Sequence, residues 1–277
     1  MPVHPSAVAD AYARLTEVFP GLAVTELGPT DPAPADGGWT GADALAAGGP
    51  GLDAFLAEDE AQVLRDYGTR ARPDVVASFG LHRYAWPACL LFTVPWFLHR
   101  RVPRLPATHV WYDRAAGLMA VRPRSFACLP GDPAAALPGA RVVPGEEALR
   151  AELRAAAAEH LEPVLAAFGP RMRRRGRALW GMATDEIVEG LWYVAHLLGE
   201  DERARRELEL LLPGATRPYA GSAAFRELTG PDGERLPTRD RASCCMFYTV
   251  RPEDTCTTCP RTRDADRIAK LTAASNY

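Results

Sequence analysis

Four of the six cysteines of this 277-residue chain lie close together near its C-terminal end. They follow the spacing C-C-x10-C-x2-C and are Cys244, Cys245, Cys256 and Cys259. Thiolates are good ligands for soft and borderline metals, and four of them suit either a Cys₄ zinc site or an iron–sulfur cluster. In a reducing compartment, clustered cysteines indicate metal or redox chemistry more often than disulfides. The spacing therefore predicts a metal centre on these four residues.

The two halves of this pattern differ in what they indicate about the metal. Cys256 and Cys259 form a Cys-x-x-Cys turn closed by Pro260, which would suit zinc as well as iron. The adjacent Cys244 and Cys245 point to opposite sides of an extended segment, so they reach one small ion only if the backbone bends. A 2Fe–2S cluster is a larger target, and we therefore favour it over zinc or an unligated or disulfide-bonded pair. The stretch contains no histidine, which argues for ligation by cysteine alone.

Residues 241–260 resemble the C-terminal motif of FhuF-type ferric-siderophore reductases. The resemblance includes the full cysteine spacing and the ending Cys259-Pro260. It also includes neighbours of the cysteines, which are Arg241, Ser243, Phe247 and Tyr248. Upstream, Leu81-His82-Arg83-Tyr84 and Arg177-Ala178-Leu179-Trp180-Gly181 are similar to family segments more diffusely. One departure is Thr249, where the resemblance predicts a basic residue.

The resemblance implies a reductase that converts Fe(III) in an imported siderophore, most simply a hydroxamate, to Fe(II) through a 2Fe–2S cluster. No catalytic residue beyond the cluster ligands is implied. The sequence has no Gly-x-Gly-x-x-Gly element after a strand, so we expect a separate protein donor such as a ferredoxin. The alternative from another class is a non-enzymatic redox sensor or scaffold that holds zinc or an iron–sulfur cluster.

Composition and charge limit the classes of partner and the cellular location that we expect for the protein. A formal net charge of −3 argues against a nucleic-acid partner. The N-terminal residues 1–5 carry no charged segment followed by an apolar one, so we expect no secretory signal and a soluble, cytoplasmic protein. The longest apolar stretch, residues 84–98, contains two prolines and is too short to span a bilayer. A peripheral contact of this stretch with a membrane stays open.

The hydrophobic pattern predicts a mainly helical α+β body with a small antiparallel β-hairpin or sheet and a C-terminal iron–sulfur lobe. We place the siderophore-binding body at residues 1–235 and the 2Fe–2S lobe at residues 236–277. The predicted helices cover residues 6–18, 51–67, 73–100, 146–168, 177–198, 201–212 and 264–274, the third of them interrupted near Pro87 and Pro95. The predicted strands cover residues 109–112, 118–121 and 125–129, the last as a third strand beside the hairpin.

Several residues outside the cysteine cluster also carry expectations. Cys89 and Cys128 sit in apolar surroundings and are predicted to be buried, unreactive thiols. His196 lies within an apolar helical stretch and is predicted to be a core residue. The basic run Arg171–Arg177 is either a solvated loop or a docking patch for an acidic electron donor.

Overall fold

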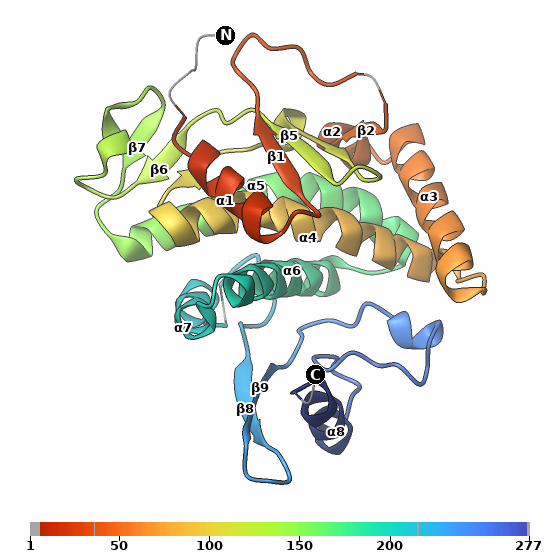
Figure 1. The fold of residues 1–277 in the computed structure, drawn as a ribbon. Helices are drawn as coiled ribbons and strands as arrows, with labels where there is room; N and C mark the ends of the chain where they lie inside the picture. Colours follow the sequence, from red (N-terminus) through yellow and green to blue (C-terminus); the bar gives the residue numbers. More distant parts are fainter. Residues whose placement is uncertain (1–5, 36, 215, 276–277) are drawn as a thin grey trace.

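The protein, seen in a computed structural model, consists of helical layers with small sheets on one side and a β-hairpin and helix on the other (Figure 1). The structure describes residues 6–35, 37–214 and 216–275. The N-terminal residues 1–5, on which the absence of a signal was predicted, lie outside the described residues. The helices are α1 Ala9–Val18, α2 Ala42–Ala46, α3 Pro50–Tyr67, α4 Pro73–His99, α5 Glu146–Met172, α6 Gly176–Leu197, α7 Asp201–Leu211 and α8 Asp264–Ser275, with the 3₁₀ turns η1 Ala107–His109, η2 Pro133–Ala136 and η3 Phe247–Thr249.

The strands form separate small sheets. They are β1 Ala23–Glu26, β2 Trp39–Gly41, β3 Val102–Pro103, β4 Val110–Asp113, β5 Leu118–Val121, β6 Phe126–Cys128, β7 Ala140–Val142, β8 Phe225–Thr229 and β9 Arg235–Arg239. One sheet has the order β1-β5-β4-β2, a second has β3-β6-β7, and β8 pairs with β9. In the first sheet β1 runs parallel to β5, and β4 and β5 form the antiparallel hairpin predicted from the sequence. The mainly helical α+β fold class is thus confirmed.

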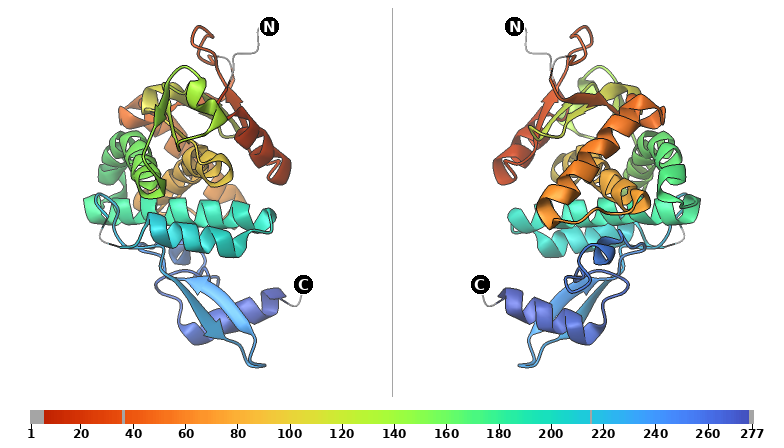
Figure 2. Two further views of the ribbon diagram at one scale, coloured as in Figure 1. Left: turned by 90° about the vertical axis from the view of Figure 1, so that its left-hand side faces the viewer. Right: turned by 90° about the vertical axis from the view of Figure 1, so that its right-hand side faces the viewer.

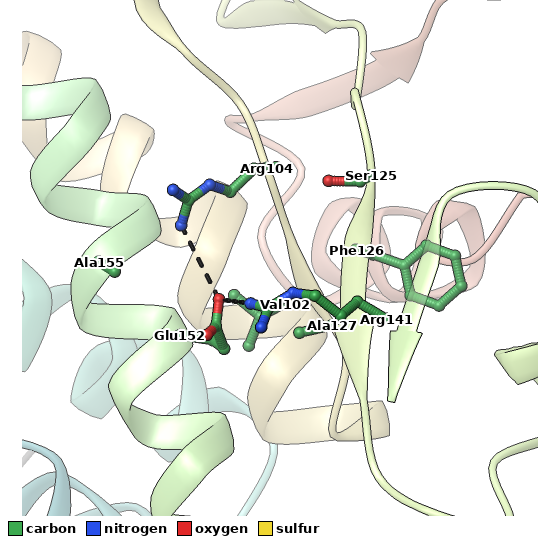
Figure 3. Close-up of a pocket in the computed structure, with 8 residues that line it drawn as sticks. All are labelled: Val102, Arg104, Ser125, Phe126, Ala127, Arg141, Glu152 and Ala155. Carbon is green, nitrogen blue, oxygen red and sulfur yellow. Dashed lines mark ion pairs between the residues drawn. The ribbon is translucent and has the colours of Figure 1, made fainter. Parts of the chain in front are cut away.

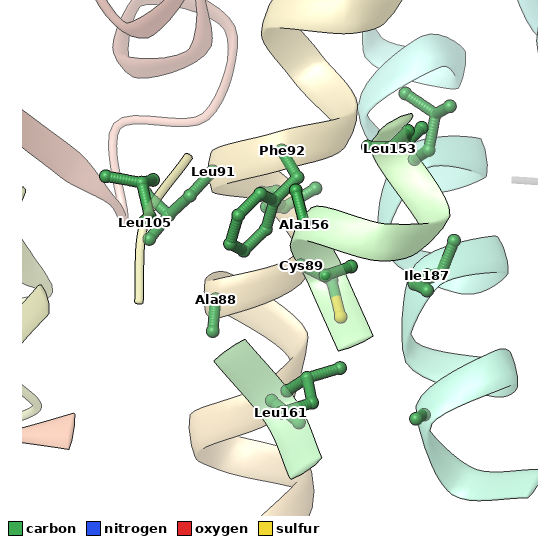
Figure 4. Packing of buried hydrophobic residues seen from close by; sticks show 14 of the residues in the cluster. Ala88, Cys89, Leu91, Phe92, Leu105, Leu153, Ala156, Leu161 and Ile187 are labelled. Carbon is green, nitrogen blue, oxygen red and sulfur yellow. The ribbon is translucent and has the colours of Figure 1, made fainter. Parts of the chain in front are cut away.

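Helix α4 is the centre of the body. It packs against α5 and α6, and nearly all of its length is buried. Figure 4 shows Cys89 and Phe92 of α4 beside Leu153 and Ala156 of α5, with Ile187 of α6 facing them. This close packing holds α6 in a defined position, and α6 is the helix on which the cysteine-bearing segment rests.

The expected interruption of this helix at its prolines is wrong. Helix α4 continues from Pro73 to His99 through both Pro87 and Pro95. A proline in a helix removes one N–H and leaves the carbonyl four residues earlier without its partner. For Pro95 that carbonyl belongs to Leu91, and the Tyr12 hydroxyl of α1 donates to it at 3.0 Å. A tertiary hydrogen bond thus satisfies the group that the proline leaves free.

Two strand expectations also need correction. Residues 126–128 do form a strand, but β6 pairs with β3 and β7 and does not join the β4–β5 hairpin. The β8–β9 hairpin lies in a part of the chain for which no strand was predicted. The alternating hydrophobic pattern of these strands is weak because Glu227, Arg235 and Pro237 occupy exposed positions and the charged Arg239 occupies a buried one.

The β8–β9 hairpin and α8 extend from the side of α6 that faces away from α4 (Figures 1 and 2). Helix α8 contacts both strands of this hairpin. The chain between β9 and α8 carries the four clustered cysteines. The predicted boundary between residues 235 and 236 falls at the start of β9, which pairs with β8. The division of the chain into a body and a lobe stays a prediction.

Candidate iron–sulfur site

The four clustered cysteines come together as two close pairs. The sulfur atoms of Cys244 and Cys259 lie 3.9 Å apart, and Cys245 and Cys256 line the same small cavity. Cys259 is buried, and the other three are partly buried. Two thiolates on one tetrahedral metal ion, with bonds of about 2.3 Å, lie roughly 3.8 Å apart. The 3.9 Å separation is therefore one that a shared metal ion would require.

The backbone bends directly after the adjacent cysteines. Met246 adopts a left-handed conformation with φ of 68°, and its N–H points back to the Cys244 sulfur at 3.4 Å. The chain then continues as η3, in which the Thr249 N–H donates to the Met246 carbonyl at 2.9 Å. This bend resolves the difficulty that adjacent side chains in an extended segment point apart. It lets Cys244 and Cys245 take different partners on the other half of the motif.

The Cys256–Cys259 half is a closed turn whose carbonyl groups accept hydrogen bonds from Thr262 and Arg267. The Cys259 N–H donates to the Cys256 carbonyl at 3.2 Å, and the Thr262 hydroxyl donates to the same carbonyl at 2.8 Å. The guanidinium of Arg267, from α8, donates to the Cys259 carbonyl at 2.9 Å. With its backbone carbonyls bonded, this turn keeps both sulfurs on the side of Cys244 and Cys245.

Asp185 on α6 anchors the segment before the first cysteine. Its carboxylate accepts the backbone N–H groups of Ala242 and Ser243, both at 2.9 Å, and the Arg239 guanidinium at 2.8 Å. Asp185 and Arg239 are both fully buried. Burial raises the pKa of Asp185, and the positive charges of Arg239 and Arg241 oppose that rise. A buried carboxylate with three donors positions the backbone that leads into Cys244.

Further carboxylates of α6 surround Arg241. Its guanidinium nitrogens lie 3.5 Å from Glu186 and 3.3 Å from Glu189. Burial raises the pKa of Glu189, but Arg241 and Arg239 outweigh it, so that pKa is lowered overall. Glu189 also accepts the Thr258 hydroxyl at 2.8 Å. The same helix thus holds both halves of the cysteine motif.

A main-chain hydrogen bond joins these halves directly. The Arg241 N–H donates to the Thr258 carbonyl at 3.1 Å. Residues 242–243 also pass very close to α6 at Gly181, where an added Cβ would lie 3.3 Å from the Ser243 Cβ. A larger residue at that position would push the motif away from the helix. Gly181 is part of the upstream segment 177–181 that resembles the reductase family.

The other upstream segment also reaches the site. His82 on α4 lies 2.8 Å from Glu186 through its Nδ1, and the negative charge of Glu186 raises the pKa of His82. His82 and Arg83 line a cavity of about 230 Å³ together with Arg241, Cys245 and Cys256. Tyr67, Phe79 and Phe247 form its apolar wall. Residues far apart in sequence thus meet beside the cysteines.

The arrangement suits a two-metal cluster better than a single ion. Across the part of the chain that the structure describes, no group of three or more histidine, cysteine or carboxylate side chains is placed to hold one metal ion. The cysteines are instead arranged two by two, as the two irons of a 2Fe–2S cluster with two thiolates each would need. The Ser243 hydroxyl beside them is buried and has no hydrogen-bond partner among the described residues. It is a donor available to a sulfur atom.

The comparison with protein families agrees with this geometry. Residues 241–261 match the model of the FhuF 2Fe–2S C-terminal domain. Over this short region the chain has the cysteine motif of an FhuF-type 2Fe–2S domain. The match covers the cysteine motif and its immediate neighbours only. Comparison with curated proteins and with solved structures gives no match.

The FhuF-type domain makes the cofactor a 2Fe–2S cluster, as the spacing predicted, in preference to zinc. Within the described ranges, no helix combines the length and the apolar character needed to cross a bilayer.

Cys89 and Cys128 are buried away from the motif, and burial raises the pKa of both thiols. Their predicted burial is confirmed, and their lack of reactivity stays a prediction.

Other expectations fare differently. His196 is not a core residue, because its side chain is 71% exposed and pairs with Asp201 at 3.1 Å. In the basic run, Arg171 pairs with Asp53 at 2.6 Å, and most of the remaining arginines are exposed.

Sequence reasoning missed Asp185, Glu186 and Glu189. Their signal was three acidic residues within five positions on an otherwise apolar helix, which require buried cationic partners.

Proposed function

We propose that the protein is a ferric-siderophore reductase. In this proposal it transfers one electron to Fe(III) held in a siderophore and so forms Fe(II). The observation that carries the proposal is the FhuF-type 2Fe–2S domain at residues 241–261, within which four cysteines form two close pairs. Each Fe(III) that becomes Fe(II) takes one electron, which is what one such cluster exchanges.

We propose that Cys244 and Cys259 hold one iron of the cluster and that Cys245 and Cys256 hold the other. The pairing is supported by the 3.9 Å sulfur separation in the first pair and by the cavity that Cys245 and Cys256 both line. No other side chain is proposed as catalytic. Asp185 and Glu189 would act by holding the two cysteine-bearing turns against α6.

The chemistry of the substrate favours a strongly reducing centre. Hydroxamates are hard oxygen donors that hold Fe(III) far more tightly than Fe(II), so their ferric complexes have low reduction potentials. A 2Fe–2S cluster on four cysteines supplies an electron at about −400 mV in plant-type ferredoxins. We propose a hydroxamate siderophore as the substrate for this reason.

The electron would come from a separate protein, for which a ferredoxin is our proposal, and the reaction would take place in the cytoplasm. Iron would be reduced inside its chelator without being ligated by the protein. This part rests on the ligand inventory: among the described residues, no group of three or more metal-binding side chains could take a single iron ion. Release of Fe(II) would follow from its weaker hold by the chelator.

The test uses protein reduced with dithionite and freed of excess reductant. A ferric trihydroxamate should restore the visible absorbance of the oxidised cluster, and an Fe(II) trap should increase the yield. The same siderophore carrying redox-inert gallium, or no metal, should leave the spectrum unchanged. If the gallium complex oxidises the cluster as fast, or if no ferric chelate does so, the protein is not a siderophore reductase.

The alternative function, a non-enzymatic redox sensor or scaffold, has a distinct outcome in the same experiment. A sensor would hold the cluster, but ferric chelates would oxidise that cluster no faster than dioxygen or ferricyanide does. A colourless protein that contains zinc would also contradict the reductase.

A further inference from the structure

A large cleft opens beside the second half of the cysteine motif. It has a volume of about 540 Å³, within the range of about 300–1,000 Å³ that small-molecule sites span. It lies between α4, α6, the end of α1 and the cysteine motif. Its aromatic and hydroxyl-bearing lining residues, which define what we call the aromatic cleft, are Phe19, Trp86, Trp192, Tyr193, Thr257 and Thr258.

Three rings form one wall of the aromatic cleft. Phe19, Trp86 and Tyr193 contact one another edge to face, with centroid separations of 5.6, 5.7 and 5.8 Å. Tyr193 is nevertheless 45% exposed, and the other two rings are only partly buried. Large aromatic side chains that stay partly open to solvent in a concave surface are typical of ligand sites.

The aromatic cleft reaches the cysteine motif itself. Thr257 and Thr258 are the two residues between Cys256 and Cys259. The hydrogen bond from Thr258 to Glu189 on α6 fixes this turn at the edge of the cleft. A molecule that fills the cleft therefore touches residues directly bonded to two of the proposed cluster ligands, which is a position suited to electron transfer.

The acidic residues around the aromatic cleft have basic neighbours. Glu189 is paired with Arg239 and Arg241, and Glu186 lies 2.8 Å from His82. The residues that line the cleft include no lysine or arginine, which favours an uncharged occupant over a multiply charged anion. Three singly charged hydroxamates cancel the charge of Fe(III), whereas three catecholates leave a complex with three negative charges.

Two other cavities fit such a ligand less well. The cavity of about 230 Å³ beside Cys245 and Cys256 is smaller, and the Arg241 guanidinium lies in its lining. The cavity in Figure 3 lies between α5 and the β3-β6-β7 sheet, where Arg104 and Arg141 both pair with Glu152. Its lining includes none of the four clustered cysteines.

We propose that the aromatic cleft binds the organic shell of a neutral ferric chelate and holds it against the Thr257–Thr258 turn. This inference rests on the proposed reductase function. Tyr193 and Trp86 would contact the chelate directly, and their role would be binding, since neither touches the cysteine sulfurs.

The experiment measures binding without electron transfer. The protein with its cluster is titrated with a gallium trihydroxamate in a calorimeter, in parallel with the Tyr193→Ala and Tyr193→Phe variants. Tyr193 is exposed enough for either replacement to fold, and iron content per chain checks that the cluster is intact. We expect Tyr193→Ala to raise Kd about tenfold, or about 1.4 kcal/mol, and Tyr193→Phe to bind like the wild type.

The control and rival variants decide the location. Leu210→Ala, at an exposed position of α7 outside the cleft, should bind like the wild type. A loss confined to Tyr67→Ala would place the chelate in the smaller cavity and overturn the assignment. Unchanged binding in Tyr193→Ala, or no binding by the wild type, would also overturn it. If ferric chelates still oxidise the wild-type cluster in those cases, the reductase function stands and only the cleft is wrong.

Discussion

The Asp185 carboxylate accepts the backbone N–H of Ser243 at 2.9 Å, on the residue directly before the first clustered cysteine. Asp185 is a side chain of the rigid α6, and Ser243 belongs to a loop that carries no regular secondary structure of its own. The bond therefore transfers the position of the packed helices to the cysteine motif.

The first prediction concerns Asp185. Asp185→Asn keeps the shape but leaves the buried Arg239 without one of its two carboxylate partners. Because breaking a buried ion pair leaves an uncompensated charge, we expect the free energy of unfolding to fall by about 3 kcal/mol. Iron content per chain should fall with it. Thermal unfolding and iron analysis measure both effects.

Glu202→Gln is the matched control for that variant. Glu202 lies at the start of the adjacent α7, and its side chain is 85% exposed. Its replacement should change the free energy of unfolding by no more than about 0.5 kcal/mol. Equal losses in both variants would show that Asp185 has no special role in holding the motif.

The second prediction concerns the cluster ligands. Single Ser replacements of Cys244, Cys245, Cys256 or Cys259 should each remove or distort the visible absorption of the cluster, because a hydroxyl is a poorer ligand for iron than a thiolate. Cys89→Ala and Cys128→Ala should keep the spectrum, since both thiols are buried elsewhere. A cluster that survives any of the four Ser replacements unchanged would exclude that residue as a ligand.

The third prediction concerns the basic run before α6. If it docks an acidic protein donor, Arg175→Glu with Arg177→Glu should slow reduction of the cluster by a ferredoxin several-fold, and the defect should shrink as salt rises. Reduction by dithionite should be unaffected. Arg206→Glu, at a position of α7 that is 67% exposed, is the control. An unchanged rate with the protein donor would make the run a solvated loop.

The fourth prediction concerns pH and His160. This histidine is fully buried, with Nδ1 donating to the Leu105 carbonyl at 2.8 Å and Nε2 accepting the Tyr84 hydroxyl at 2.7 Å. Burial lowers its pKa from 6.5 to about 4. As the pH falls through this window, the unfolded chain binds a proton that the folded chain does not. The contribution of His160 to stability is therefore present above pH 6.5 and is lost toward pH 4.

The measurement is a comparison of wild type and His160→Gln by urea unfolding at several pH values. At pH 7 the variant should be less stable by about 2 kcal/mol because two buried hydrogen bonds are disturbed. Between pH 6.5 and pH 4 the wild type should lose up to about 3 kcal/mol relative to the variant, so near pH 4 the variant should be the more stable of the two. A difference that stays constant over this range would show that His160 titrates alike in both states.

The sequence alone determined the chemistry of the site and most of the helices. Thiolate chemistry depends on residue type and short spacing, so four cysteines within residues 244–259 were enough to predict a 2Fe–2S cluster. Helix α7 and the β4–β5 hairpin were also predicted closely, because local periodicity and turn residues define them.

Only the tertiary structure decided how the cysteines are held and what surrounds them. Asp185 and Ser243 are far apart in the chain, and no local pattern indicates that a carboxylate of α6 accepts the backbone of the cysteine segment. The Leu91 carbonyl that Pro95 leaves without its helical partner accepts a hydroxyl from α1, a contact likewise invisible to local propensity. The aromatic cleft exists because the packing of α4 against α6 brings Trp86 beside Tyr193, a contact that long-range burial determines.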